Sequence, residues 1–65
     1  MKIRYQGKET ETGADTVAAF LATQGVDAAE GVVELDGEIV AADSVAATSL
    51  REGAVLNVFR IVAGG

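Results

Sequence analysis

The start of the chain has the pattern of two short strands. Apolar residues occupy positions 1, 3 and 5 and polar residues occupy positions 2, 4 and 6. This period of two predicts a half-buried strand over residues 1–6. Gln6-Gly7-Lys8 then reads as a hairpin turn, and residues 8–12 are polar but compatible with a second strand. Because this second strand has little apolar surface to bury, we expect it at the edge of a sheet.

An amphipathic helix is predicted after this hairpin. Asp15 or Thr16 can cap its start with a side-chain oxygen, and Gly25 suits the position just beyond its end. Alanines between these two signals raise the helix propensity of the segment. We expect a helix of about nine or ten residues that packs an apolar stripe on a sheet. The stripe consists of Val17, Phe20 and Leu21.

A second hairpin is predicted in the middle of the chain. Residues 32–35 favour a strand, Asp36-Gly37 is a strong tight-turn dipeptide, and Ile39-Val40 resumes the apolar run. We interpret Asp36-Gly37 as a turn with no further role.

The segment after this hairpin, residues 41–49, is small and weakly patterned. We expect irregular structure there, with a helical turn after Asp43 that brings Val45 and Leu50 to the core.

The last element is a long strand. Glu52-Gly53 predicts a turn, and residues 54–62 are rich in large apolar side chains. Alternation places Leu56 and Val58 on one face of this strand and Asn57, Phe59 and Ile61 on the other.

If the helix covers the first face, the second one is an exposed patch of the kind that marks a docking site for a partner. We therefore predict partner docking at Phe59, Ile61 and Asn57. In the alternative, residues 41–49 fold over this face and bury Phe59.

The predicted order β-β-α-β-β-β indicates an α+β roll, in which one helix crosses a mixed sheet. The chain has 65 residues, enough for one domain with a modest core. We expect a domain over residues 1–62 and a flexible tail over residues 63–65, which carry no large side chain. The predicted core consists of Ile3, Tyr5, Val17, Phe20, Leu21, Val33, Leu35, Leu50, Leu56 and Val58.

Composition argues against an intrinsic enzyme. The sequence contains no Cys and no His, which removes disulfides, thiolate nucleophiles and the usual general base. The carboxylates have no metal-loop spacing, so we predict no metal site and no cofactor.

The charge balance also narrows the partners. Ten acidic residues against five basic ones give a net charge of −5, so phosphate backbones would repel the chain and we expect no nucleic-acid partner. An acidic surface suits a protein partner with a basic docking face. No long apolar run or signal-peptide pattern occurs, so we expect a cytoplasmic protein with no membrane association.

The whole chain resembles the ThiS family, the thiamin-pathway sulfur carriers of ubiquitin-like β-grasp fold. The resemblance rests on the order of elements, the length, Thr16-Val17 at the helix start, Glu52-Gly53 before the last strand, and two longer motifs. These motifs are Asp36-Gly-Glu-Ile-Val40 and the ending Phe59-Arg-Ile-Val-Ala-Gly-Gly65.

The resemblance implies a chemistry carried out by partner enzymes. An E1-like adenylating enzyme, ThiF-like, would convert the carboxylate of Gly65 to an acyl-adenylate, and sulfur would then replace AMP to form a thiocarboxylate. A sulfur-accepting thiazole synthase, ThiG-like, would take the sulfur, and a cysteine desulfurase is a further candidate partner. Val62, Ala63 and Gly64 would enter the partner active site as the tail, where the lack of Cβ on glycine permits close approach.

Three alternatives stay open. The MoaD family, the small subunit of molybdopterin synthase, shares the Val-Ala-Gly-Gly type of ending and an aromatic residue at the position of Phe59, although its members are usually longer. A ubiquitin-like protein modifier would use the same activated Gly65 to form an isopeptide bond. A binding module would have no terminal chemistry.

Overall fold

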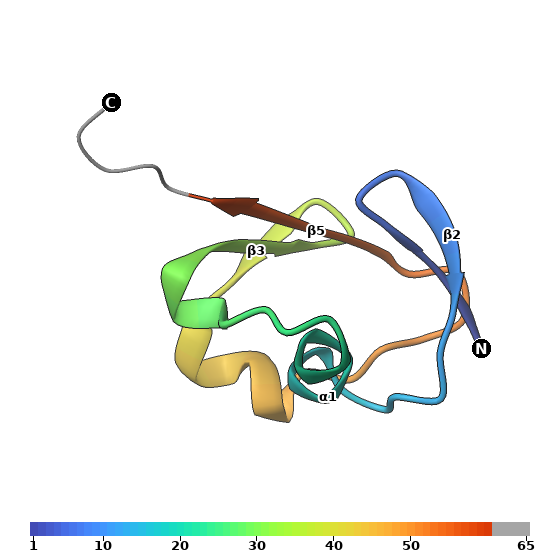
Figure 1. Cartoon of the computed structure of the whole chain (residues 1–65), viewed down its shortest axis with the longest axis horizontal. Helices are drawn as coiled ribbons and strands as arrows, with labels where there is room; N and C mark the ends of the chain where they lie inside the picture. Colours follow the sequence, from blue (N-terminus) through green and yellow to red (C-terminus); the bar gives the residue numbers. More distant parts are fainter. Residues whose placement is uncertain (61–65) are drawn as a thin grey trace.

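The computed structural model describes residues 1–60, which form one five-stranded sheet with helical segments beneath it (Figure 1). The elements in chain order are β1 (Lys2–Tyr5), β2 (Lys8–Glu11), α1 (Val17–Thr23), the 3-10 helix η1 (Ala28–Glu30), β3 (Gly31–Leu35), β4 (Glu38–Val40), the 3-10 helix η2 (Ala42–Ala47) and β5 (Val55–Arg60).

The sheet has the strand order β2-β1-β5-β3-β4. β1 and β5 are parallel, whereas the other neighbouring strands are antiparallel. The long last strand therefore lies in the centre, and the two hairpins flank it. This confirms the predicted mixed sheet with one α-helix and the predicted edge position of β2.

Both hairpins turn through residues in the left-handed region. Gln6 and Gly7 have φ angles of 51° and 79°, and Asp36 and Gly37 have φ angles of 51° and 87°. Positive φ at both central residues is typical of the type I′ turn, whose twist matches that of two paired strands. Asp and Gly suit these positions well, whereas Gln is an unusual choice.

α1 begins and ends at the residues that the sequence indicates. The Thr16 hydroxyl accepts a hydrogen bond from the Ala19 N–H at 3.1 Å, and Gly25 follows the helix with φ 67°. The helix is shorter than predicted, with Thr23 as its last residue. It ends in a Schellman motif, because Gly25 takes a positive φ and the Val26 N–H closes on the Leu21 carbonyl at 3.0 Å.

The core lies between the sheet and α1. Tyr5 contacts Phe20 edge to face, with ring centroids 4.9 Å apart. All ten predicted core residues contribute, although Tyr5 and Leu35 are only partly buried. Val45 reaches the core as predicted, and Ala54 joins it. The buried residues are Ile3, Val17, Phe20, Leu21, Val33, Val45, Leu50, Ala54, Leu56 and Val58.

Residues 41–49 pack against α1 and not over the open face of the sheet. Backbone hydrogen bonds join Val17 N–H to the Thr48 carbonyl at 2.9 Å and Leu50 N–H to the Asp15 carbonyl at 2.8 Å. The segment forms η2, which begins at Ala42, so our expectation of irregular structure with one helical turn understated its order. η1 was not predicted at all; the Asp27 side chain caps it by accepting from Ala29 N–H at 2.9 Å.

Candidate functional site

The uncovered face of the sheet is the first candidate site. In Figure 1, α1 and η2 lie below the sheet, and none of the helices within residues 1–60 covers the side above it. On β5, Leu56 and Val58 are buried while Phe59 is 54% exposed, so the predicted alternation is confirmed. Phe59 is therefore a surface residue, and the alternative in which residues 41–49 bury it is wrong.

Two further apolar side chains share this face with Phe59. Val32 on β3 pairs directly with Phe59, and Ile39 on β4 pairs with Glu34. Ile39 is therefore a diagonal neighbour of Val32 on the same face, and it is 75% exposed. We call Val32, Ile39 and Phe59 the sheet-face patch.

The sequence reasoning missed Ile39 as a surface residue. A signal was present, because a tight turn at Asp36-Gly37 sets the register of the hairpin and so places Ile39 opposite the polar Glu34.

Asn57 lies on the same face but already has a partner. Its side-chain amide donates to the Glu34 carboxylate at 3.3 Å, and the two residues are directly paired across β3 and β5. Asn57 is half-buried. It therefore separates the sheet-face patch from Val55, which is 39% exposed near the start of the strand.

Both hairpin turns hold β5 in place. At its start, the Asp36 carboxylate accepts from Val55 N–H at 2.8 Å while the Asp36 N–H donates to the Val55 carbonyl at 2.8 Å. The predicted turn at Asp36-Gly37 is confirmed, and the hydrogen bonds of Asp36 to β5 add a structural contact that the sequence did not indicate. Further along, the Gln6 amide accepts from Val58 N–H at 2.8 Å and donates to the Val58 carbonyl at 2.9 Å.

Near the end of β5, the backbone of Gly31 on β3 approaches the strand closely. A Cβ atom added at Gly31 would lie 2.6 Å from the Phe59 carbonyl oxygen, a distance that ordinary packing does not allow. Gly31 pairs with Arg60, the last residue of β5. Only a glycine permits this backbone approach without a shift of one strand.

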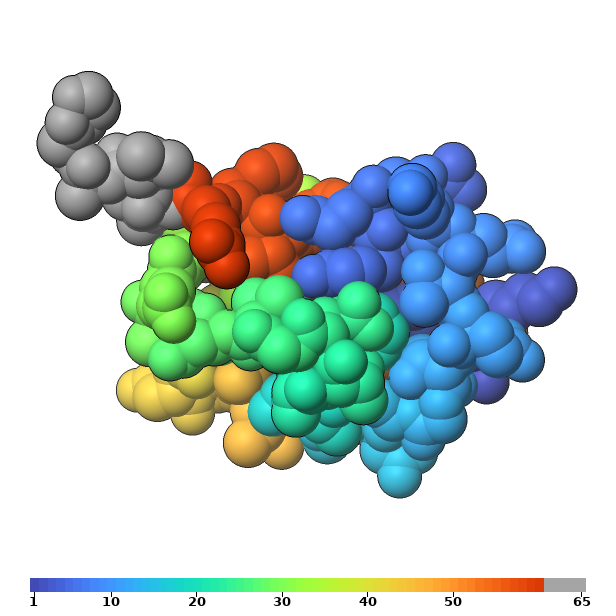
Figure 2. Space-filling view, viewed as in Figure 1, coloured from blue at the N-terminus to red at the C-terminus, as the bar shows by residue number. Residues whose placement is uncertain are grey.

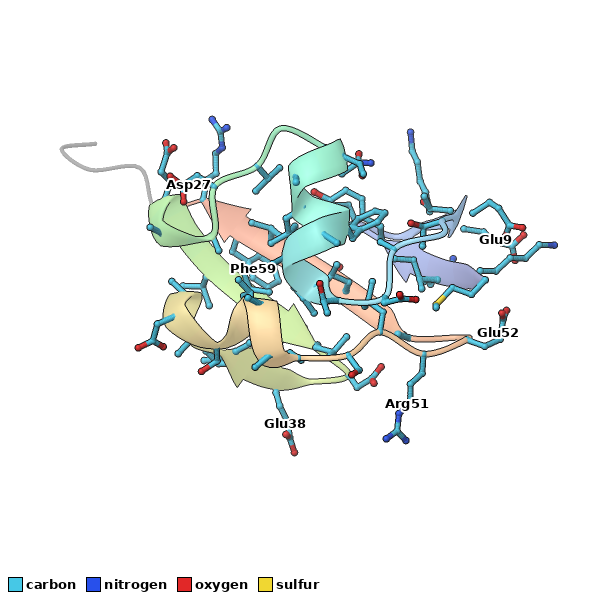
Figure 3. The ribbon with its side chains drawn as sticks, turned by 90° about the horizontal axis from the view of Figure 1, so that it is seen from below. Glu9, Asp27, Glu38, Arg51, Glu52 and Phe59 are labelled. Atoms are coloured by element: carbon cyan, nitrogen blue, oxygen red, sulfur yellow. The ribbon has the colours of Figure 1, made fainter. Side chains whose placement is uncertain are left out.

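Basic and acidic residues are separated along the sequence. All five basic residues lie near the two ends of the described chain, and every acidic residue except Glu52 lies between Glu9 and Asp43. In Figure 3, Glu9, Glu38, Arg51 and Glu52 point outward around the rim of the molecule. The helical segments α1, η1 and η2 contain two acidic residues, Glu30 and Asp43, and no Lys or Arg.

The space-filling view shows where β5 reaches the surface. In Figure 2, its orange and red atoms lie between the blue β1-β2 hairpin and the green segment that contains η1. A small hollow at this end is lined by the loop before η1 and by residues of η1, β3 and β5, including Asp27, Glu30 and Arg60.

The remaining predicted site residues lie outside the described chain. They are Ile61 of the predicted docking surface, and Val62, Ala63, Gly64 and Gly65 of the predicted tail. The predicted strand over residues 54–62 is seen as β5 over Val55–Arg60.

Residues 1–60 present neither a metal-ion cluster nor a membrane-spanning helix. No group of three or more acidic side chains there could hold a metal ion. α1, the longest helix of this part, is far too short to cross a bilayer.

Comparison with known proteins gives a consistent family. The ThiS family model matches residues 3–65. A crystal structure of the thiamine biosynthesis protein ThiS from Geobacter metallireducens superposes with a TM-score of 0.84 at 28% identity, covering 100% of both chains. An NMR solution structure of a thiamine biosynthesis protein from the same organism has a TM-score of 0.76 at 29% identity, covering 100% of this chain and 88% of the other.

The comparison with curated proteins finds no significant match. The family model nevertheless spans nearly the whole sequence, and the fold agrees over the full length of a solved ThiS protein. The chain therefore belongs to the ThiS family and has its ubiquitin-like β-grasp fold.

Proposed function

We propose that this protein is a sulfur carrier for thiamine biosynthesis, in which the carboxylate of Gly65 is activated and then carries the sulfur. The observation that supports this most strongly is the family match, which extends to residue 65 and so includes the terminal Gly-Gly. Both solved relatives are described as thiamine biosynthesis proteins, which favours this pathway over molybdopterin synthesis. In this proposal residues 1–62 are the folded carrier and residues 63–65 its reactive tail.

The proposed chemistry has two steps, both in partner active sites. A carboxylate oxygen of Gly65 attacks the α-phosphorus of ATP, and pyrophosphate leaves to give an acyl-adenylate. A sulfide nucleophile then attacks the carbonyl carbon, the bond to AMP breaks, and a thiocarboxylate remains. The chain supplies no catalytic group to either step, since it contains no Cys or His. It acts as the bound substrate of an E1-like, ThiF-like enzyme and then as the sulfur donor to a ThiG-like synthase.

The sheet-face patch is the proposed docking site for the adenylating enzyme. Phe59 and Ile39 are large apolar side chains that folding leaves exposed. Phe59 lies on the central strand β5, which leads toward Gly65, and Ile39 lies on the edge strand β4. Aromatic residues that fill a partner pocket often carry much of the binding energy at an interface. Ile61, which follows Arg60, is proposed to extend this surface. Asn57 is proposed as a contact at its border, together with its partner Glu34.

Mass spectrometry of the intact protein tests the proposed chemistry directly. The chain is incubated with the adenylating enzyme, ATP, magnesium and a sulfide source, and fragmentation locates any added mass. We expect a mass gain equal to replacement of oxygen by sulfur at Gly65. A matched variant with one alanine appended after Gly65 should show no such gain. Conjugation to lysines of other proteins, without a thiocarboxylate, would favour a protein modifier instead.

A further inference from the structure

The Gln6 side chain extends the sheet beyond the end of β1. Backbone pairing between β1 and β5 runs as far as Tyr5 opposite Leu56, with a last hydrogen bond from Gln6 N–H to the Leu56 carbonyl at 3.1 Å. At Gln6 the backbone turns away with φ 51°. The side-chain amide then takes the place of the next strand residue, because it binds both the N–H and the carbonyl of Val58.

The turn itself does not explain a glutamine at this position. The first central residue of a type I′ turn is typically Asn, Asp or Gly, because these tolerate the left-handed conformation. The second hairpin follows this rule with Asp36. A long side chain at Gln6 adds conformational cost without helping the turn, so its two hydrogen bonds to Val58 are the feature that accounts for it.

These bonds lie at the end of β5 that leads to the terminal Gly-Gly. The N–H and carbonyl groups of successive residues in a strand point to opposite edges. Leu56 faces β1, so Val58 and Arg60 face the β1 side as well. β1 has already ended there. Within residues 1–60, Gln6 is therefore the last hold on β5 from this side, while Gly31 approaches the Phe59 carbonyl from the other.

We infer that Gln6 is a positioning residue for the adenylation of Gly65. It fixes the last residues of β5, and with them both Phe59 of the sheet-face patch and the point from which the chain continues toward Gly65. Preorganisation of this kind matters because Phe59 and the strand end dock together, and a carrier docked in a displaced geometry presents its terminus to the partner's active site less productively. This inference rests on the proposed function.

The test compares matched substitutions in the two hairpins. Gln6→Gly places a residue that tolerates positive φ at this position and removes the side chain whose amide binds Val58. Asp36→Gly is the control, because it makes the same change at the same turn position and removes the hydrogen bond to Val55, at the start of the strand. Gln6→Glu keeps an acceptor for Val58 N–H but loses the donor to the Val58 carbonyl, so an intermediate effect is expected.

Pyrophosphate release by the adenylating enzyme is measured over a range of carrier concentrations. For Gln6→Gly we expect kcat to fall about tenfold with a smaller change in KM, and kcat of Asp36→Gly to stay near the wild-type value. Hydrogen exchange should become faster at the Val58 amide in Gln6→Gly alone. Thermal melts verify that each variant is folded under the assay conditions.

Two results would overturn the inference. One is an unchanged kcat in folded Gln6→Gly, and the other is an equal fall in kcat for both glycine variants, which indicates a general loss of sheet stability. An unchanged exchange rate at Val58 in Gln6→Gly would contradict the hydrogen bonds themselves, independently of any activity. Failure of the proposed function looks different, because the wild-type protein would then release no pyrophosphate and gain no sulfur.

Discussion

Replacing Phe59 with alanine should separate docking from folding. Phe59 is 54% exposed and its direct cross-strand partner is Val32. An aromatic and a β-branched residue paired across strands contribute about 0.2–1 kcal/mol, so Phe59→Ala should lower the free energy of unfolding by about 1 kcal/mol. That is well below the roughly 3–5 kcal/mol lost when a packed Phe is removed from a core. For a domain of this size it corresponds to a fall in Tm of about 4–8 °C.

The same substitution should weaken binding to the adenylating enzyme much more. An interface aromatic that fills a pocket is worth about 1–3 kcal/mol or more, which corresponds to an increase in Kd of about 5- to 150-fold. Titration calorimetry of wild type and variant against the enzyme measures this change, and thermal melts measure the change in stability.

Leu56→Ala is the control for this experiment. Leu56 is fully buried on the opposite face of the same strand, and removal of a buried leucine side chain costs about 2–5 kcal/mol. Its Tm should fall much further than that of Phe59→Ala, while the Kd of the folded fraction stays near the wild-type value. Should Phe59→Ala melt as low as Leu56→Ala, or bind the enzyme as tightly as wild type, the docking role of the sheet-face patch would be refuted.

Further substitutions test the strand end, the helix cap and the tail. Gly31→Ala should lower the free energy of unfolding by about 1–3 kcal/mol in urea titrations, because the added Cβ would meet the Phe59 carbonyl oxygen. Gly13→Ala is its control and should be nearly neutral, because no atom lies within 4 Å of the Cβ added there. Thr16→Ala should cost about 1 kcal/mol of unfolding free energy, since it removes the acceptor for the Ala19 N–H, and an unchanged urea midpoint would contradict this. Gly64→Val should lower the thiocarboxylate yield in the mass assay without changing Tm, because a β-branched residue restricts the backbone that must enter the partner's active site.

Local patterns in the sequence determined most of the fold. The period of two along β5 correctly assigned Leu56 and Val58 to the core and Phe59 to the surface, because side chains of a strand alternate whatever lies beside it. The helix start at Thr16 and the turn at Asp36-Gly37 likewise depend on residues next to one another in the chain. The expectation that the chain carries a group for partner enzymes came from its resemblance to the ThiS family, while composition argued only against an intrinsic enzyme.

The tertiary structure alone decided which distant residues meet. Ile39 and Phe59 share the sheet-face patch because β3 pairs with β5 and places the second hairpin beside the last strand, and Gln6 binds Val58 because β1 lies parallel to β5. The need for glycine at position 31 likewise appears only when β3 is placed against the Phe59 carbonyl. Such contacts join residues far apart in the sequence, and they depend on the pairing and register of whole strands, which a one-dimensional pattern of apolar and polar residues does not encode.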